Sequence, residues 1–360
     1  MAVQDSTAIK KLHHEIKSTS YKQVFITMPK VLVLCPDENA PIGGIRVLYR
    51  HVDILNKNGI SASILHLKKD FRCTWFQNST SIVTYKDCST IEECDVLVLP
   101  EIYGPNMHNE IILQKKNFLG IRKNITLDVR HVKKVIFNQN AHYTFDHYPH
   151  EISHRTSPYL QPDVLATIVV SEHSRHYIQS VFPEHRVHRI RLGCDESIFY
   201  YSKDKKKQIA FMPRKHPMDI TRVINTLKFK GALDGWQLVP IEGKTERQVG
   251  ELLRESSIFM SFGSQEGFQL PPAEAMACGC IAVGYHGYGG KEFMEQDFAY
   301  PVPVHDIVSF AEVMEQVLQQ FESNPLQMQL MGKQASEYML ANHTYAHEEA
   351  DVMALWNTLL

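Results

Sequence analysis

The chain has 360 residues, of which 44% are hydrophobic and 22% are charged, and its formal net charge is -2. This length exceeds that of one ordinary compact core and predicts two domains of a globular protein. The composition argues against a membrane-spanning protein, because no stretch approaches roughly 18 consecutive apolar residues, and against nucleic-acid binding, because no basic-aromatic stripe or zinc-finger spacing occurs.

The first half of the chain alternates between apolar runs and helical patterns. Residues 1–29 are predicted to form a polar leader without the apolar segment of a signal peptide. A continuous apolar run at 30–35 predicts a buried parallel strand, and a helix at 46–58, closed by Gly59, leads to a second strand at 61–67. Further buried strands are predicted at 95–100, 134–138 and 166–171. Strands that alternate with helices imply a parallel sheet covered on both faces.

The second half repeats this pattern after a polar, Lys-rich connector at 186–207. Strands are predicted at 208–212, 236–241, 258–262 and 281–285, and helices at 219–230, 245–257, 272–278, 306–321, 325–342 and 345–360. The predicted fold class is therefore α/β, with two consecutive doubly wound domains. The predicted divisions are the leader at 1–29, a first domain at 30–190, a second domain at 191–342 and a closing helix at 343–360.

One loop of the second domain carries most of the chemical information. Ligands of parallel sheets bind beyond the carboxyl ends of the strands, and the loop after the strand at 258–262 continues from Glu266 as EGFQLPPAEAMACG. Pro271 and Pro272 suit the first turn of a helix, whose free amides form an anion site. Glu266 and Glu274 are placed to face one ligand, and carboxylates accept hydrogen bonds from the hydroxyls of ribose and hexose. The segment predicts a nucleotide-sugar site.

This segment, followed by a Gly-Gly-x-Glu element at 289–292, resembles the E-x7-E signature of the retaining family-4 glycosyltransferases. The resemblance implies a GT-B architecture, in which two facing Rossmann-like domains enclose a deep cleft. The first domain would bind the acceptor, the second would bind the nucleotide sugar, and the closing helix would cross back to the first. Glu274 would hold the ribose hydroxyls of the donor. The donor sugar and phosphates would contact Glu266 and the backbone of Gly267, Phe268, Gln269 and Leu270.

The basic clamp of the family departs from its usual form in this chain. The family places an arginine after the first strand of the second domain and a lysine five residues further on. Here Asp219 stands five residues after Arg214. We expect Arg214 and Lys215 together to neutralise the leaving diphosphate, because developing charge must be stabilised in such a reaction. Two other cations, Arg222 and Lys291, could neutralise the diphosphate in their place.

Two features of the first domain also match the family. Gly43 and Gly44 correspond to the glycine pair whose backbone approaches the donor diphosphate, where a Cβ would block close approach. The family also has a histidine near the anomeric carbon, in a loop after a central strand. His142 is the best match for it, followed by Asn140, because both lie just after the strand at 134–138. The expected catalytic residues are therefore His142, Arg214, Lys215 and Glu266.

A zinc site is a rival interpretation of the histidines in this region. The set consists of His142, His147, His150 and His154. Pro149 interrupts the helix that would bring the last three together, and no acid or cysteine stands at a recognised metal spacing. We therefore expect no metal and no cofactor, with the nucleotide sugar as co-substrate.

The implied reaction is transfer of a sugar from a UDP- or GDP-type donor to an acceptor hydroxyl, with retention at the anomeric carbon. The acceptor would be a glycan or a lipid-linked molecule in polysaccharide, lipopolysaccharide or glycoconjugate biosynthesis. Two alternatives remain: a sugar-nucleotide 2-epimerase of the same fold, and a non-catalytic protein that binds nucleotide sugars.

The cysteines and the charge distribution bear on location. Seven scattered cysteines predict reduced, buried thiols in a cytoplasmic protein. Residues 1–180 hold 21 Lys and Arg against 17 Asp and Glu. This basic excess allows the first domain a peripheral contact with the inner face of a membrane.

Overall fold

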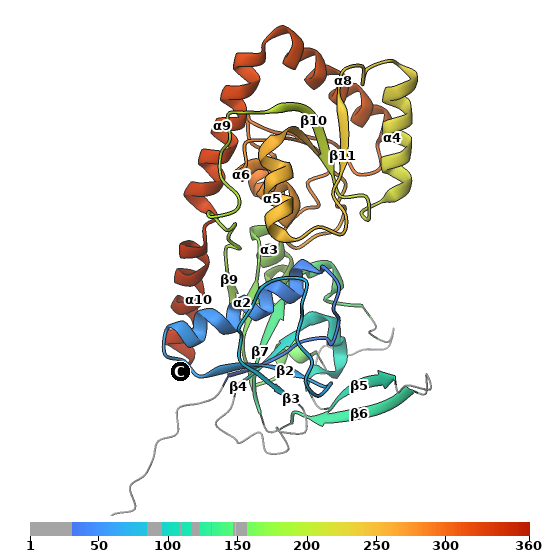
Figure 1. Cartoon of the computed structure of the whole chain (residues 1–360). Helices are drawn as coiled ribbons and strands as arrows, with labels where there is room; N and C mark the ends of the chain where they lie inside the picture. The colour runs from blue at the N-terminus through green and yellow to red at the C-terminus, as the bar shows by residue number, and fades with distance from the viewer. Residues whose placement is uncertain are drawn as a thin grey trace, which may run out of the picture.

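The computed structural model describes residues 31–84, 96–108, 110–116, 122–130, 132–146, 148 and 157–360. The predicted leader at 1–29 lies outside these residues. The described chain forms two parallel sheets that follow one another in the sequence, each flanked by helices (Figure 1). This is the predicted α/β class, with short apolar runs as buried strands.

The first sheet has the strand order β3-β2-β1-β4-β7-β8-β9 among the described residues. Its strands are β1 (Val31–Leu34), β2 (Ala62–His66), β3 (Ile82–Thr84), β4 (Val96–Pro100), β7 (Lys133–Asn138), β8 (Val164–Val169) and β9 (Val187–Arg189). The helices of this half are α2 (Gly43–Lys57) and α3 (Glu172–Val181), with the shorter turns η2 (Glu101–His108), η3 (Ala141–Tyr143) and η5 (Pro158–Leu160). Every position of β1, β2 and β4 is buried, as expected for strands covered on both faces.

The second sheet has the order β11-β10-β12-β13-β14. Its strands are β10 (Lys206–Phe211), β11 (Gln237–Pro240), β12 (Ser256–Ser261), β13 (Ile281–Gly284) and β14 (Tyr300–Pro301). Its helices are α4 (Pro217–Phe229), α5 (Glu246–Glu255), α6 (Leu270–Ala277), α7 (Lys291–Met294), α8 (Ile307–Ser323) and α9 (Pro325–Asn342). The predicted connector at 186–207 contributes to both sheets, since β9 pairs with β8 and β10 starts at Lys206.

Each sheet reverses its strand order once. In the first sheet the chain moves outward from β1 to β3 and then restarts at β4 on the other side of β1. In the second sheet the reversal lies between β10 and β12. Loops after the two central strands diverge at such a point and leave a crevice at the carboxyl edge. The fold therefore predicts that four loops, after β1, β4, β10 and β12, line any ligand site.

The last helix, α10 (Tyr345–Leu359), leaves the second sheet and packs against α2 of the first half (Figure 1). The indole Nε1 of buried Trp356 donates to Nε2 of His51 at 2.9 Å. Burial lowers the pKa of His51 to about 3, so the ring is neutral and its nitrogen can accept. Arg191 adds a bidentate ion pair with Asp351, at 2.8 and 2.7 Å. The halves are thus joined by their closing helix.

Several elements were not predicted, among them the strands β3, β9 and β14, the helices α3 and α7, and the antiparallel hairpin of β5 (Glu110–Lys116) and β6 (Arg122–Asp128) at one end of the first domain (Figure 1). No helix among the described residues combines the length and the apolar character needed to cross a membrane.

Candidate donor site between the two sheets

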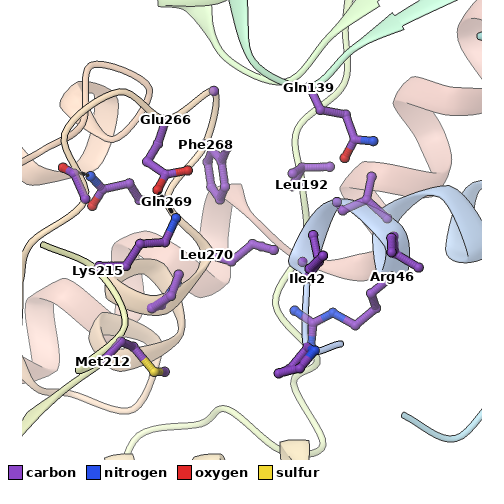
Figure 2. Close-up of a pocket in the computed structure, with 18 of the residues that line it drawn as sticks. Ile42, Arg46, Gln139, Leu192, Met212, Lys215, Glu266, Phe268, Gln269 and Leu270 are labelled. Carbon is purple, nitrogen blue, oxygen red and sulfur yellow. Dashed lines mark hydrogen bonds and ion pairs between the residues drawn. The ribbon is translucent and has the colours of Figure 1, made fainter. Parts of the chain in front are cut away.

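A cavity of about 720 Å³ lies between the two halves of the molecule, and the loops after β1, β4, β10 and β12 all line it. The first half contributes Gly43, Gly44, Arg46, Glu101, Gln139, Asn140 and Tyr143, among others. The second half contributes Arg214, Lys215, Glu266, Gly267, Phe268, Gln269, Leu270 and Glu274, among others. Figure 2 shows the two groups facing each other, with Ile42, Arg46, Gln139 and Leu192 opposite Lys215 and the loop from Glu266 to Leu270. Apart from His142, the structure brings together every residue predicted for the site.

The loop between β12 and α6 is held by its own side chains and by its neighbour loop. The Gln269 side chain accepts from Ser261 Oγ at 2.8 Å and donates to the Gly263 carbonyl at 2.7 Å. Gln269 is the N-cap residue of α6, but its side chain forms no capping bond with the helix. Pro271 and Pro272 carry no N–H, and the Ala273 N–H donates to the Gln269 carbonyl at 3.3 Å, so Leu270 supplies the N–H of the first turn of α6 that an anion at the cavity wall can accept from.

Glycines let the two halves approach closely at this loop. A Cβ on Gly267 would lie 1.7 Å from the carbonyl oxygen of Gln139. A Cβ on Gly43 would lie 2.9 Å from Leu270 Cδ1, and one on Gly44 would lie 3.0 Å from Gln139 Oε1. Nearby, Asn140 Nδ2 donates to the Gln265 carbonyl at 2.9 Å. Gly43 and Gly267 therefore allow close contact between the halves, whereas Gly44 makes room for the Gln139 side chain of its own half.

The two predicted cations differ in their surroundings. Lys215 Nζ forms an ion pair with Glu266 Oε1, which links the loops after β10 and β12. Arg214 is exposed, and within the described part of the chain its side chain forms neither an ion pair nor a hydrogen bond. Both line the cavity, so both can meet an anion there. The alternatives do not line it: Arg222 pairs with Asp219 at 3.7 Å, and Lys291 pairs with Glu295 at 3.8 Å.

Glu274 is buried at the cavity wall, with 6% of its surface exposed. Its Oε1 accepts from Arg46 Nη2 at 2.7 Å, and Arg46 Nη1 also pairs with Glu246 Oε1. Burial raises the pKa of Glu274, while the Arg46 charge and hydrogen bond act in the opposite direction. Arg46 was not among the predicted site residues. Its position two residues after Gly44 was the signal that could have identified it.

Glu101 is a second cavity residue that was not predicted from the sequence. It is 3% exposed, and its carboxylate accepts the backbone N–H groups of Gln139 and Asn140, each at 3.0 Å. Burial raises its pKa to about 7, although these two hydrogen bonds favour the ionised form. Glu101 directly follows the strand predicted at 95–100. It could have been predicted, because ligand sites of parallel sheets lie beyond the carboxyl ends of the strands.

The structure places His142 away from the cavity lining. The turn η3 directs its ring toward α3, where it stacks on His173 at 5.3 Å and lies 5.2 Å from Tyr288, measured between ring centroids. Its Nε2 is buried without a hydrogen-bond partner in the described structure. Asn140 and Tyr143, from the same turn, line the cavity instead. The catalytic role of His142 stays a prediction that this geometry does not support.

The predicted alternative metal site cannot be assembled here, because His147, His150 and His154 lie outside the described residues. A different set comes together beside the cavity: ligand atoms of His216, Asp219 and His305 lie within 4.8 Å of one another. These groups already have partners. His305 Nδ1 is 2.7 Å from Asp219 Oδ2, and His216 Nε2 is 2.7 Å from Ser264 Oγ.

Residues 220–354 match a family model described as glycosyl transferase-like. The chain is 25% identical over 257 residues to an alpha-1,6-glucosyltransferase of Actinobacillus pleuropneumoniae, covering 68% of this chain and 69% of the relative. Among solved structures, Anabaena HepE in complex with UDP is similar with a TM-score of 0.61 and 10% identity, covering 91% of this chain and 100% of that one. A sucrose-phosphate synthase from Thermosynechococcus elongatus is similar with a TM-score of 0.60 and 11% identity, covering 92% and 99%. The expected GT-B fold is confirmed.

Proposed function

We propose that this chain, a glycosyltransferase of GT-B fold, is a retaining enzyme of the family-4 type that transfers a sugar from a UDP- or GDP-type donor to an acceptor hydroxyl. One observation carries the proposal. Glu266 and Glu274 stand on either side of the start of α6, and both line one cavity with the backbone of the loop that ends at Leu270 and with Lys215. Carboxylates that accept hydrogen bonds from hydroxyls, and groups that donate hydrogen bonds to phosphates, thus line the same cavity. A single ligand that carries hydroxyls and phosphates can meet both.

Each group has a distinct task in this proposal. Glu274 accepts hydrogen bonds from the ribose hydroxyls, and Glu266 accepts from the donor sugar. The N–H groups of the loop from Gly267 to Leu270, with Lys215 and the exposed Arg214, neutralise the diphosphate. HepE, whose fold is similar, was solved in complex with UDP, which supports a uridine nucleotide as the first donor to test.

The reaction then relies on positioning and charge stabilisation. In a front-face displacement the acceptor hydroxyl attacks on the side from which the diphosphate leaves, so no side chain needs to act as a covalent nucleophile. Cations at the diphosphate stabilise the charge that develops as the glycosidic bond breaks. The first half would hold the acceptor, beside Glu101, Gln139 and Tyr143 of the cavity wall. We propose that no metal takes part.

A nucleotide screen followed by product analysis tests this function. UDP, GDP, ADP and their common sugars are added to the purified chain, and the Tm is measured, because a ligand that binds only the folded state raises it. The stabilising nucleotide sugar is then incubated with glycan acceptors, and the anomeric configuration of the product is read by NMR. We expect a rise in Tm for one nucleotide family and a retained anomer.

Other outcomes separate the alternatives. Rapid release of free sugar and nucleotide without acceptor would indicate a 2-epimerase. Binding without turnover on every acceptor would indicate a non-catalytic binding protein. An inverted anomer would contradict the retaining mechanism, and the absence of any stabilising nucleotide would contradict the donor site.

A further inference from the structure

Arg46 is the cavity residue whose contacts are least expected for a helix of the first half. It lies in the first turn of α2, yet its guanidinium contacts two carboxylates of the second half, Glu274 on α6 and Glu246 on α5. We infer that Arg46 is a positioning residue for the donor site: it keeps Glu274 ionised and oriented toward the ribose, so that donor recognition requires both halves of the molecule. This inference rests on the proposed function, because the ribose is the ligand assigned to Glu274.

Burial makes the pairing of Glu274 obligatory. A carboxylate that is removed from water is unfavourable unless it is paired and hydrogen-bonded. Within the described part of the chain, the one side chain that donates to the Glu274 carboxylate is Arg46. Of the other titratable groups near Glu274, the carboxylate of Glu246 on α5 raises the pKa of Glu274. The other two are the neutral thiols of Cys194 after β9 and Cys278 after α6. The charged state of Glu274 therefore depends on Arg46.

The geometry leaves Glu274 free to bind a hydroxyl while the pair stays formed. Arg46 contacts Oε1 of Glu274, and no hydrogen bond to Oε2 forms among the described residues. Oε2 can thus accept from a ribose hydroxyl without breaking the ion pair. Because the guanidinium binds one oxygen, it holds Oε1 in place and leaves Oε2 for a second donor.

The same contact couples donor binding to closure of the cleft. Glu246 and Glu274 belong to the second half, whereas Arg46 is carried by the helix that starts at Gly43. If the halves separated, the Glu274 carboxylate would lose its counter-ion and the guanidinium that holds its Oε1 in place. Full binding of the donor therefore requires α2 to lie against α5 and α6.

Arg46→Met tests this role, because methionine keeps an unbranched side chain without the charge. The matched control is Lys57→Met on the same helix, which removes an ion pair with Glu349 of α10, at 2.6 Å, outside the cavity. Isothermal titration with UDP and GDP is carried out between about pH 6 and about pH 9. We expect Arg46→Met to weaken nucleotide binding by roughly tenfold or more at neutral pH and to regain affinity as rising pH ionises Glu274. Lys57→Met and the native chain should show no such pH dependence, and Arg46→Lys should restore part of the affinity.

A second readout needs no ligand. In Arg46→Met the raised pKa of Glu274 makes the folded state lose stability as pH rises through it. The Tm of Arg46→Met should therefore fall relative to that of the double variant Arg46→Met/Glu274→Gln as pH rises. Equal Tm values at every pH, or a loss of affinity in Arg46→Met that does not vary with pH, would overturn the inference. Failure of the native chain to bind any nucleotide, with this Tm divergence intact, would refute the proposed function alone.

Discussion

Lys215 and Glu266, which follow neighbouring strands of the second sheet, form an ion pair at the wall of the cavity between the two halves. The pair sets the resting charge of the site: the cation assigned to the diphosphate is partly neutralised until a donor arrives. A diphosphate with its two phosphate groups would compete with the single carboxylate for Lys215. The resting pair would also keep the lysine side chain in position for the donor.

Loss of Lys215 should therefore affect catalysis more than folding. We expect Lys215→Ala to reduce turnover by at least about 100-fold, because the charge on the leaving diphosphate loses one of the two cations assigned to it. The measurement is release of nucleoside diphosphate under saturating donor. Arg222→Ala is the matched control, since Arg222 is exposed and does not line the cavity. Near-normal turnover in Lys215→Ala would show that Lys215 does not stabilise the leaving group.

Gly267 should tolerate no side chain. A Cβ there would lie 1.7 Å from the backbone oxygen of Gln139, so Gly267→Ala must push the two halves apart. We expect lost nucleotide binding and a lower Tm. Gly235→Ala is the comparison, because Gly235 has a left-handed φ of 79° but no atom within 4 Å of an added Cβ, so its expected effect is about 1 kcal/mol of backbone strain with binding intact. Equal behaviour of the two variants would contradict the close approach.

Glu101 should make stability depend on pH around neutrality. Its pKa is raised to about 7 in the folded state from an ordinary value near 4.5. The protonated form is thus favoured in the folded chain, and its stabilisation is present at low pH and is lost as pH rises through about 7.

Relative to Glu101→Gln, the native chain should lose about 2 kcal/mol of unfolding free energy between pH 5.5 and pH 8. Urea unfolding of both proteins at the two pH values measures this difference. A difference that stays constant with pH would mean that Glu101 titrates at its ordinary value.

Chelation should leave activity unchanged. We expect turnover after treatment with EDTA to equal that of untreated enzyme, because the proposed reaction places cationic side chains at the diphosphate. A loss that added Mn²⁺, Mg²⁺ or Zn²⁺ restores would contradict this expectation. The set of His216, Asp219 and His305 would then be the first to substitute.

Much of the fold could be predicted because its buried parallel strands are short apolar runs. Runs such as 30–35 and 95–100 became β1 and β4, and the paired prolines marked the start of α6. The hairpin of β5 and β6 was not predicted, because its strands carry lysine and arginine at their ends and lack a clear alternating pattern. The short strand β3 is half-buried, so it offered no apolar run.

The second-half wall of the site was predictable because its residues lie together in the sequence. The contact between Arg46 and Glu274 spans 228 positions, and no local pattern encodes which arginine reaches which carboxylate. His142 shows the converse problem. It follows a predicted strand, as a site residue should, but the turn η3 directs Asn140 and Tyr143 to the cavity and His142 to a cluster of rings. The direction of one side chain within a turn depends on tertiary packing.

A crystal structure with the nucleotide that stabilises the chain most would test the central claim directly. We predict ribose hydroxyls within hydrogen-bonding distance of Glu274 and a diphosphate at the start of α6, beside Lys215. A nucleotide bound elsewhere, or one whose ribose turns away from Glu274, would contradict the account.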